Sequence, residues 1–121
     1  MTPLGRGIAG VAPTLAPEVG TSAERSIGQG EASYYGEELA GNPTASGEPF
    51  NPNHLTAAHR SLPMGSKLRV TNVRTGDAVV VRVNDRGPYV GRRVIDLSKA
   101  AAREVGILNS GTGRVQLALV S

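Results

Sequence analysis

The 121-residue chain contains no cysteine and no tryptophan, and its few aromatic residues are Tyr34, Tyr35, Phe50 and Tyr89. The absence of cysteine excludes disulfides, thiolate catalysis and cysteine metal sites. The scarcity of aromatic residues argues against nucleic acid as a partner, because nucleic-acid-binding surfaces interleave aromatic and basic residues. No apolar run of about 18 residues occurs, so the sequence predicts no membrane span.

Charge is unevenly distributed along the chain. The whole sequence has 13 Lys and Arg against 10 Asp and Glu, a net charge of +3. Residues 30–59 contain four glutamates and no Lys or Arg, whereas residues 60–121 contain 11 basic and 4 acidic residues. The second half therefore favours an anionic polymer, and bacterial cell wall fits the scarcity of aromatics better than nucleic acid does. Most of these arginines also fit the solvated faces of a small barrel.

Apolar alternation predicts a mostly-β fold. Residues 1–29 are rich in Gly, Pro, Ala, Ser and Thr without periodicity, so we expect a disordered tail or linker there and a single folded domain over residues 30–121. A long loop is expected over 36–54, and loops of this length are usually functional. Asp96 or Ser98 can cap one short helix that ends at Gly106. The predicted strands cover 31–35, 55–60, 66–73, 78–84, 93–97 and 113–120, and the helix covers 99–105.

Asp85 ends the most strand-like run of the sequence. Residue parity places it on the same side as Val79, Val81 and Val83, at the point where the strand leaves the core. Such a position removes water from a carboxyl group and favours its protonated form, which a general acid needs. An Asp followed by Gly-Pro is also ordinary turn chemistry, so the residues alone leave both interpretations open.

His59 is the second candidate of the site, although a lone histidine is more often structural than catalytic. His54 lies five residues earlier, a spacing that matches no zinc signature, so we expect no metal site. No nucleotide-binding or dinucleotide-binding motif follows a predicted strand, and no cofactor is expected.

Two long stretches carry a family resemblance: TASGEPFNPNHLTAAHRSLPMGSKLRVTN at 44–72 and VVVRVNDRGPYVGRRVIDLSKAAAREVG at 79–106. They resemble the RlpA-like double-psi β-barrel domain of the rare lipoprotein A family of bacterial lytic transglycosylases. The resemblance implies a six-stranded double-psi β-barrel with an open substrate groove. It also implies endolytic cleavage of peptidoglycan glycan strands that lack stem peptides. The cleaved bond would be that between N-acetylmuramic acid and N-acetylglucosamine, and the product would end in 1,6-anhydro-muramic acid.

The resemblance also assigns roles to individual residues. The catalytic acid of the family falls on Asp85, its essential histidine on His59, and a loop glutamate on Glu48. A loop aspartate of the family is replaced here by Asn51, which can bind a sugar hydroxyl but cannot usefully accept a proton. The lipid-anchor cysteine of the family is absent.

These assignments give a catalytic pair, Asp85 and His59, in which His59 orients Asp85 or holds the substrate. Basic side chains can meet the lactyl carboxylates of the glycan. We expect a monomer of the cell envelope, periplasmic or secreted, that binds peptidoglycan glycan strands. Two rivals share the fold: a non-catalytic, expansin-like wall-binding or wall-loosening module, and a cellulose- or chitin-directed hydrolase. The expected substrate-binding residues are Glu48, Asn51, Arg60, Arg86 and Tyr89.

Overall fold

The computed structural model describes residues 24–120. Two short helices, η2 (Glu37–Leu39) and α1 (Lys99–Glu104), lie in the connections that follow β1 and β5. The prediction of a mostly-β domain with one α-helix is confirmed, while the single turn of η2 inside the long loop was not predicted. The strands are β1 (Glu24–Tyr34), β2 (Thr56–Ala58), β3 (Lys67–Asn72), β4 (Ala78–Asp85), β5 (Arg93–Leu97) and β6 (Gly113–Val120).

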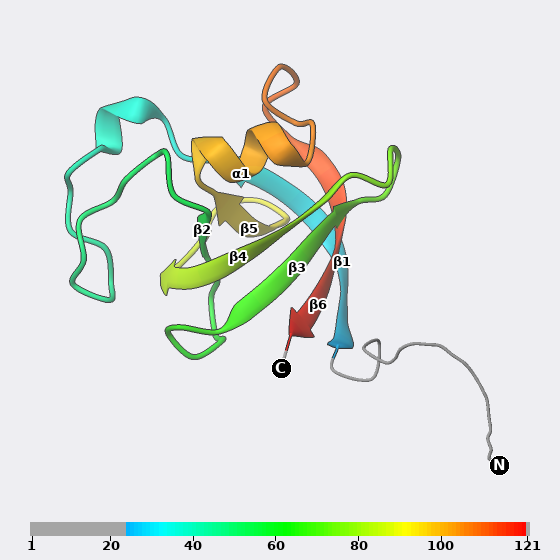
Figure 1. The fold of residues 1–121 in the computed structure, drawn as a ribbon, viewed down its shortest axis with the longest axis horizontal. Helices are drawn as coiled ribbons and strands as arrows, with labels where there is room; N and C mark the ends of the chain where they lie inside the picture. The colour runs from blue at the N-terminus through cyan, green and yellow to red at the C-terminus, as the bar shows by residue number, and fades with distance from the viewer. Residues whose placement is uncertain (1–23, 121) are drawn as a thin grey trace, which may run out of the picture.

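The strands close into a barrel in the order β1-β5-β2-β4-β3-β6 (Figure 1). Two neighbouring pairs are parallel, β1 with β5 and β2 with β4, and the other four are antiparallel. Closure leaves no free sheet edge within the barrel. The fold is the predicted six-stranded double-psi β-barrel.

The barrel begins earlier in the chain than the predicted boundary near residue 30. Strand β1 starts at Glu24 and pairs antiparallel with β6, from Glu24 opposite Val120 to Ala32 opposite Gly113. The predicted tail therefore loses residues 24–29 to the barrel, and residues 1–23 lie outside the described part of the chain. Composition was a poor guide here because backbone hydrogen bonds to β6 satisfy this segment whatever its side chains are.

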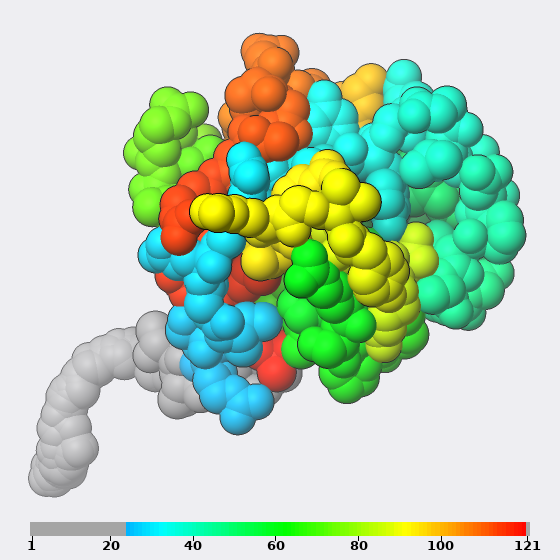
Figure 2. Space-filling model, turned by 180° about the vertical axis from the view of Figure 1, so that it is seen from behind, coloured from blue at the N-terminus to red at the C-terminus, as the bar shows by residue number. Residues whose placement is uncertain are grey.

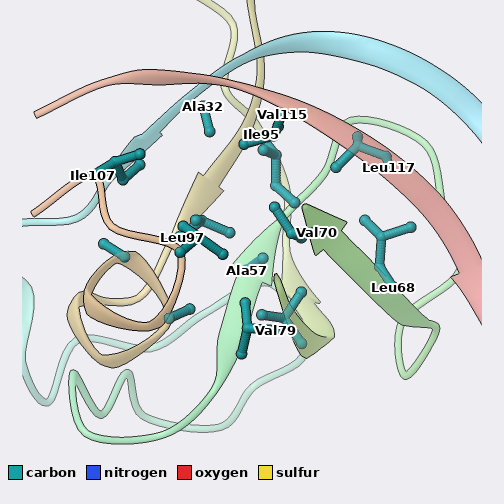
Figure 3. Packing of buried hydrophobic residues seen from close by; sticks show 14 residues of the cluster. Ala32, Ala57, Leu68, Val70, Val79, Ile95, Leu97, Ile107, Val115 and Leu117 are labelled. Carbon is teal, nitrogen blue, oxygen red and sulfur yellow. The ribbon is translucent and has the colours of Figure 1, made fainter. Parts of the chain in front are cut away.

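The interior of the barrel is filled by small and aliphatic side chains (Figure 3). Leu68, Ile95 and Leu97 are fully buried there, and α1 closes one end of the core with Ala101 and Ala102. Gly30 allows β1 to approach β5 closely, since a Cβ at this position would lie 2.5 Å from a methyl group of Val94.

Truncating Leu97 tests how tightly this core is packed. We expect Leu97→Ala to lower the free energy of unfolding by about 3 kcal/mol, because it removes a fully buried side chain from a closed barrel that cannot collapse around the cavity. Urea denaturation measures the change. The matched control is Val73→Ala, whose side chain is 47% exposed and should cost less than about 0.5 kcal/mol. Equal losses in the two variants would contradict this packing.

A capped helix and a projecting loop complete the fold. Ser98 caps α1, as predicted, by accepting a hydrogen bond from the backbone N–H of Ala101 at 3.3 Å. The loop between β1 and β2 projects from one side of the barrel (Figure 1), and in the opposite view it forms a lobe beside the chain that leaves β4 (Figure 2).

No helix within residues 24–120 is long and apolar enough to cross a membrane.

Candidate functional site

Strand β4 delivers Asp85 to the rim of the barrel. Val79, Val81 and Val83 are buried, as the parity of the strand predicted, and Asp85 is half-buried where the strand leaves the core. Strand β2 runs parallel to β4, with Ala58 opposite Asp85, and the backbone N–H of His59 donates to the Asp85 carbonyl at 3.1 Å. Asp85 at the end of β4 and His59 directly after β2 therefore lie at the same end of the barrel.

Three donors converge on the Asp85 carboxylate. The Tyr35 hydroxyl donates to Oδ2 at 2.8 Å, and the backbone N–H groups of Ala45 and Arg86 each donate to Oδ1 at 2.9 Å. The donors come from the end of β1, from the long loop and from the residue that follows β4. Together they fix the carboxylate in one orientation, which a catalytic group requires.

Asp85 forms part of the wall of an open hollow of about 200 Å³. Its other side is formed by the long loop, and Tyr35 and Phe50 pack edge to face with ring centroids 5.0 Å apart. A carboxylate is thus presented in a pocket whose remaining walls are mainly aromatic, apolar and amide groups. The lining residues are Tyr35, Leu39, Asn42, Pro43, Thr44, Phe50 and Asp85.

Tyr35 is the site residue that sequence reasoning left unassigned. Burial, above all, and the hydrogen bond and charge of Asp85 raise the pKa of Tyr35 far above its usual value, so its hydroxyl remains a donor. Tyr34 points the other way and donates to the carbonyl of Leu108 at 2.7 Å. The alternation of side chains along this segment distinguishes the two tyrosines. Ala32 and Tyr34 contact the core, whereas Ser33 and Tyr35 lie on the opposite face of the strand, where they bond to Asp96 and Asp85.

The imidazole of His59 is neutral and has a defined tautomer. Its Nδ1 accepts backbone N–H bonds from Ser61 and Leu62, each at 3.2 Å. Burial chiefly, with the nearby guanidiniums of Arg86 and Arg60, lowers the pKa of His59. The proton therefore resides on Nε2, which can donate to a ligand. Within residues 24–120 no hydrogen bond joins this ring to the Asp85 carboxylate, and Tyr35 makes that contact instead.

Glu48 fastens the long loop to the barrel. Its carboxylate forms a bidentate ion pair with Arg82 on β4, at 2.5 and 3.1 Å. The hydrogen bonds from Arg82 lower the pKa of Glu48 to about 2. Beside this pair, the backbone N–H of Ser46 donates to the carbonyl of Asn84 at 3.1 Å. These contacts hold the turn at 44–48 in the position from which Ala45 reaches Asp85.

The remaining predicted binding residues surround the site without lining the hollow. Asn51 accepts the backbone N–H of Asn53 at 2.9 Å and lies 3.3 Å from the His54 ring, as in a local turn. The Arg60 guanidinium donates to the carbonyls of Pro88 and Arg93, and that of Arg86 donates to the carbonyl of His59. Tyr89 is 72% exposed, so its ring is open to a ligand.

The protein belongs to the class of closed six-stranded β-barrels, and it carries the carboxylate of Asp85, held by three donors, at the rim. Comparison with known proteins gives the family. The family model described as lytic transglycolase matches residues 27–117. The chain belongs to this family.

The curated relatives are named endolytic peptidoglycan transglycosylase RlpA. The protein from Yersinia pestis is 63% identical over 81 residues, which is 67% of this chain and 22% of that protein. The protein from Pasteurella multocida is 52% identical over 91 residues, which is 75% of this chain and 31% of that protein. The chain thus spans less than a third of the length of these two relatives.

A solved structure extends the likeness beyond this family. The crystal structure of apo Clavibacter michiganensis expansin superposes with a TM-score of 0.61 at 27% identity, covering 78% of this chain and 50% of the expansin. The barrel is therefore shared with a protein of another name, so the fold by itself does not define an activity.

Proposed function

We propose that this domain is an endolytic peptidoglycan lytic transglycosylase. It cleaves the bond between N-acetylmuramic acid and N-acetylglucosamine in glycan strands that lack stem peptides, and it leaves 1,6-anhydro-muramic acid ends. The observation that carries the proposal is the Asp85 carboxyl group, held by three donors at the wall of an open hollow. The names of relatives at 52 and 63% identity support it.

One carboxyl group is sufficient for this reaction. Asp85 Oδ1 accepts two backbone N–H bonds and Oδ2 accepts only the Tyr35 hydroxyl, so Oδ2 is the oxygen from which the acid donates its proton to the glycan. That proton passes to the glycosidic oxygen while the bond to the anomeric carbon breaks through a transition state with oxocarbenium character. The 6-hydroxyl of the same muramic acid then attacks the anomeric carbon, and its proton returns to Asp85. No water is consumed.

The other predicted residues act on the substrate or on the loop around it. His59 donates from Nε2 to the glycan, because its Nδ1 is already occupied. Arg60 and Arg86 contribute positive charge near the lactyl carboxylates, and the exposed ring of Tyr89 packs against a sugar face. Asn51 offers a neutral amide where the family has a charged group. Glu48 acts through its ion pair with Arg82, which holds the loop on the barrel.

We also propose that the protein acts in the cell envelope, in the periplasm or outside the cell, as a monomer that binds glycan strands.

Product analysis tests the proposal against its rivals. Sacculi treated with an amidase provide glycan strands without stem peptides, and mass spectrometry of the soluble products is the measurement. A transglycosylase releases oligosaccharides with anhydro ends. Binding to the sacculi without products would favour the expansin-like alternative, which the expansin fold match supports. New reducing ends without anhydro sugars would indicate hydrolysis. Either of the last two results would refute the proposed reaction.

A further inference from the structure

A second carboxylate lies in the same row of strand positions as Asp85. Strands β1, β5, β2 and β4 are successive neighbours in the barrel. Their register pairs Ser33 with Asp96, Asp96 with Ala58, and Ala58 with Asp85. Residues paired across neighbouring strands share a face of the sheet, and strands are spaced by about 4.8 Å. Asp85 and Asp96 therefore share a face, with their backbones about 10 Å apart across β2.

This face is the outer one, on the side of the site. The register between β2 and β4 shifts by one residue between Ala57 and Ala58, so Asp85 does not continue the inward row that ends at Val83. The residues that flank Asp96 in β5, Ile95 and Leu97, point into the core, so Asp96 points away from it. Tyr35 links the two acids: its hydroxyl donates to Asp85, and the charge of Asp96 also acts on it, adding to the rise in the Tyr35 pKa.

In the part of the chain that the structure describes, only one of the two oxygens of the Asp96 carboxylate accepts a hydrogen bond. The Ser33 hydroxyl donates to Oδ1, and the Arg93 guanidinium supports Ser33 with a bond of 3.1 Å to its oxygen. Within residues 24–120 no hydrogen bond reaches Oδ2, and the Asp96 side chain is only half-buried. An ionised carboxylate is an acceptor only, so a ligand that uses Oδ2 has to be a donor.

We propose that Asp96 is a second substrate-binding residue of this groove, and that its Oδ2 accepts a hydrogen bond from a hydroxyl group of the glycan, on the sugar next to the bond cleaved at Asp85. The inference rests on the proposed function and extends it. Sugar hydroxyls are the donors that a glycan strand presents in quantity, and bonds to a charged acceptor are roughly twice as strong as neutral ones. The role is binding, since proton transfer needs only Asp85.

The rival explanation is purely structural: Asp96 ties β5 to β1 through Ser33. Two variants separate the possibilities in an Asp85→Asn background, which keeps the bound strands intact. Asp96→Asn removes the charge of the proposed acceptor, whereas Ser33→Ala removes the bond within the protein and leaves the carboxylate. Isothermal titration with glycan strands that lack stem peptides gives the Kd of each. We expect Asp96→Asn to weaken binding about tenfold and Ser33→Ala less than threefold.

Each result decides the matter. Equal weakening by both variants, or unchanged binding by Asp96→Asn, would overturn the inference while leaving the proposed function in place. Absence of any binding by the Asp85→Asn parent would contradict the proposed function as well. If Asp96→Asn does not fold, the carbon-13 carboxyl signal of Asp96 can be followed in the parent during the titration. We expect a saturable shift of that signal, and its absence under saturating glycan would overturn the inference.

Discussion

Replacing Asp85 with asparagine is expected to lower the rate of anhydro-end formation by about 1,000-fold or more. Asparagine keeps the shape of the side chain and an oxygen that can accept the N–H bonds of Ala45 and Arg86, but it has no proton to donate to the glycosidic oxygen. General acid catalysis alone contributes about 100- to 10,000-fold, and loss of the returning base adds to the deficit. Single-turnover release of anhydro-oligosaccharides from amidase-treated sacculi measures the rate.

The matched control lies at the other end of the same strand. Asp77 immediately precedes β4 and accepts a hydrogen bond from the hydroxyl of Thr75 at 3.1 Å, at the tight connection from β3. Asp77→Asn makes the same chemical change away from the hollow and should retain the full rate. An Asp85→Asn protein that released anhydro ends as fast as this control would remove Asp85 from the acid role.

The backbone of the fold was largely visible in the sequence. Period-2 alternation located five strands to within a few residues, and β5 and the cap at Ser98 agree with the structure. The same parity rule placed Asp85 on the side of Val79, Val81 and Val83. Those valines are buried, but the register between β2 and β4 shifts at this point, so Asp85 pairs with Ala58 and leaves the inward row. The start of β1 was missed because its stability comes from pairing with β6, about 90 residues away, and local composition carries no record of such a partner.

The contacts that hold the site residues in place could not be predicted from the sequence. The pairing of Glu48 with Arg82 joins residues 34 positions apart, and the N–H of Ala45 reaches Asp85 only because that loop is docked. His59 was expected to orient Asp85 or hold substrate, and Tyr35 makes the orienting contact. Side chains from three separate elements meet here, so the pattern of any one segment could not specify their partners.

The second large effect is expected from reversing the charge of Glu48. In Glu48→Arg the new guanidinium faces Arg82, so the turn at 44–48 moves away from β4 and withdraws the Ala45 N–H from Asp85. Displacements of about 1 Å at a reacting group can cost about 100-fold, and we expect kcat to fall by about ten- to a hundredfold. The free energy of unfolding should change by less than about 1 kcal/mol, because the ion pair is partly exposed.

The double variant Glu48→Arg/Arg82→Glu shows whether Glu48 acts through the loop. Restoring opposite charges should redock the turn and return kcat to within about threefold of the parent, a coupling that only a direct pair produces. A glutamate that itself contacts the glycan would not be rescued in this way, and failure of rescue would assign Glu48 to the substrate. Glu24→Arg is the matched control, because it breaks the ion pair of Glu24 with Arg69, on strands β1 and β3, and should leave kcat unchanged.

The pH dependence of the loop contact provides an independent check. Arg82 lowers the pKa of Glu48 from its usual value near 4.5 to about 2, so the pair stabilises the folded state above pH 4.5 and loses this contribution as the pH falls toward 2. Amide exchange of Ala45 and Ser46 reports the docking of the turn. We expect their protection to stay constant from pH 7 to 5, apart from the intrinsic effect of pH on exchange, and to be lost in Glu48→Arg over that whole range. Loss of protection between pH 6 and 5 in the parent protein would show that another titrating group holds the loop.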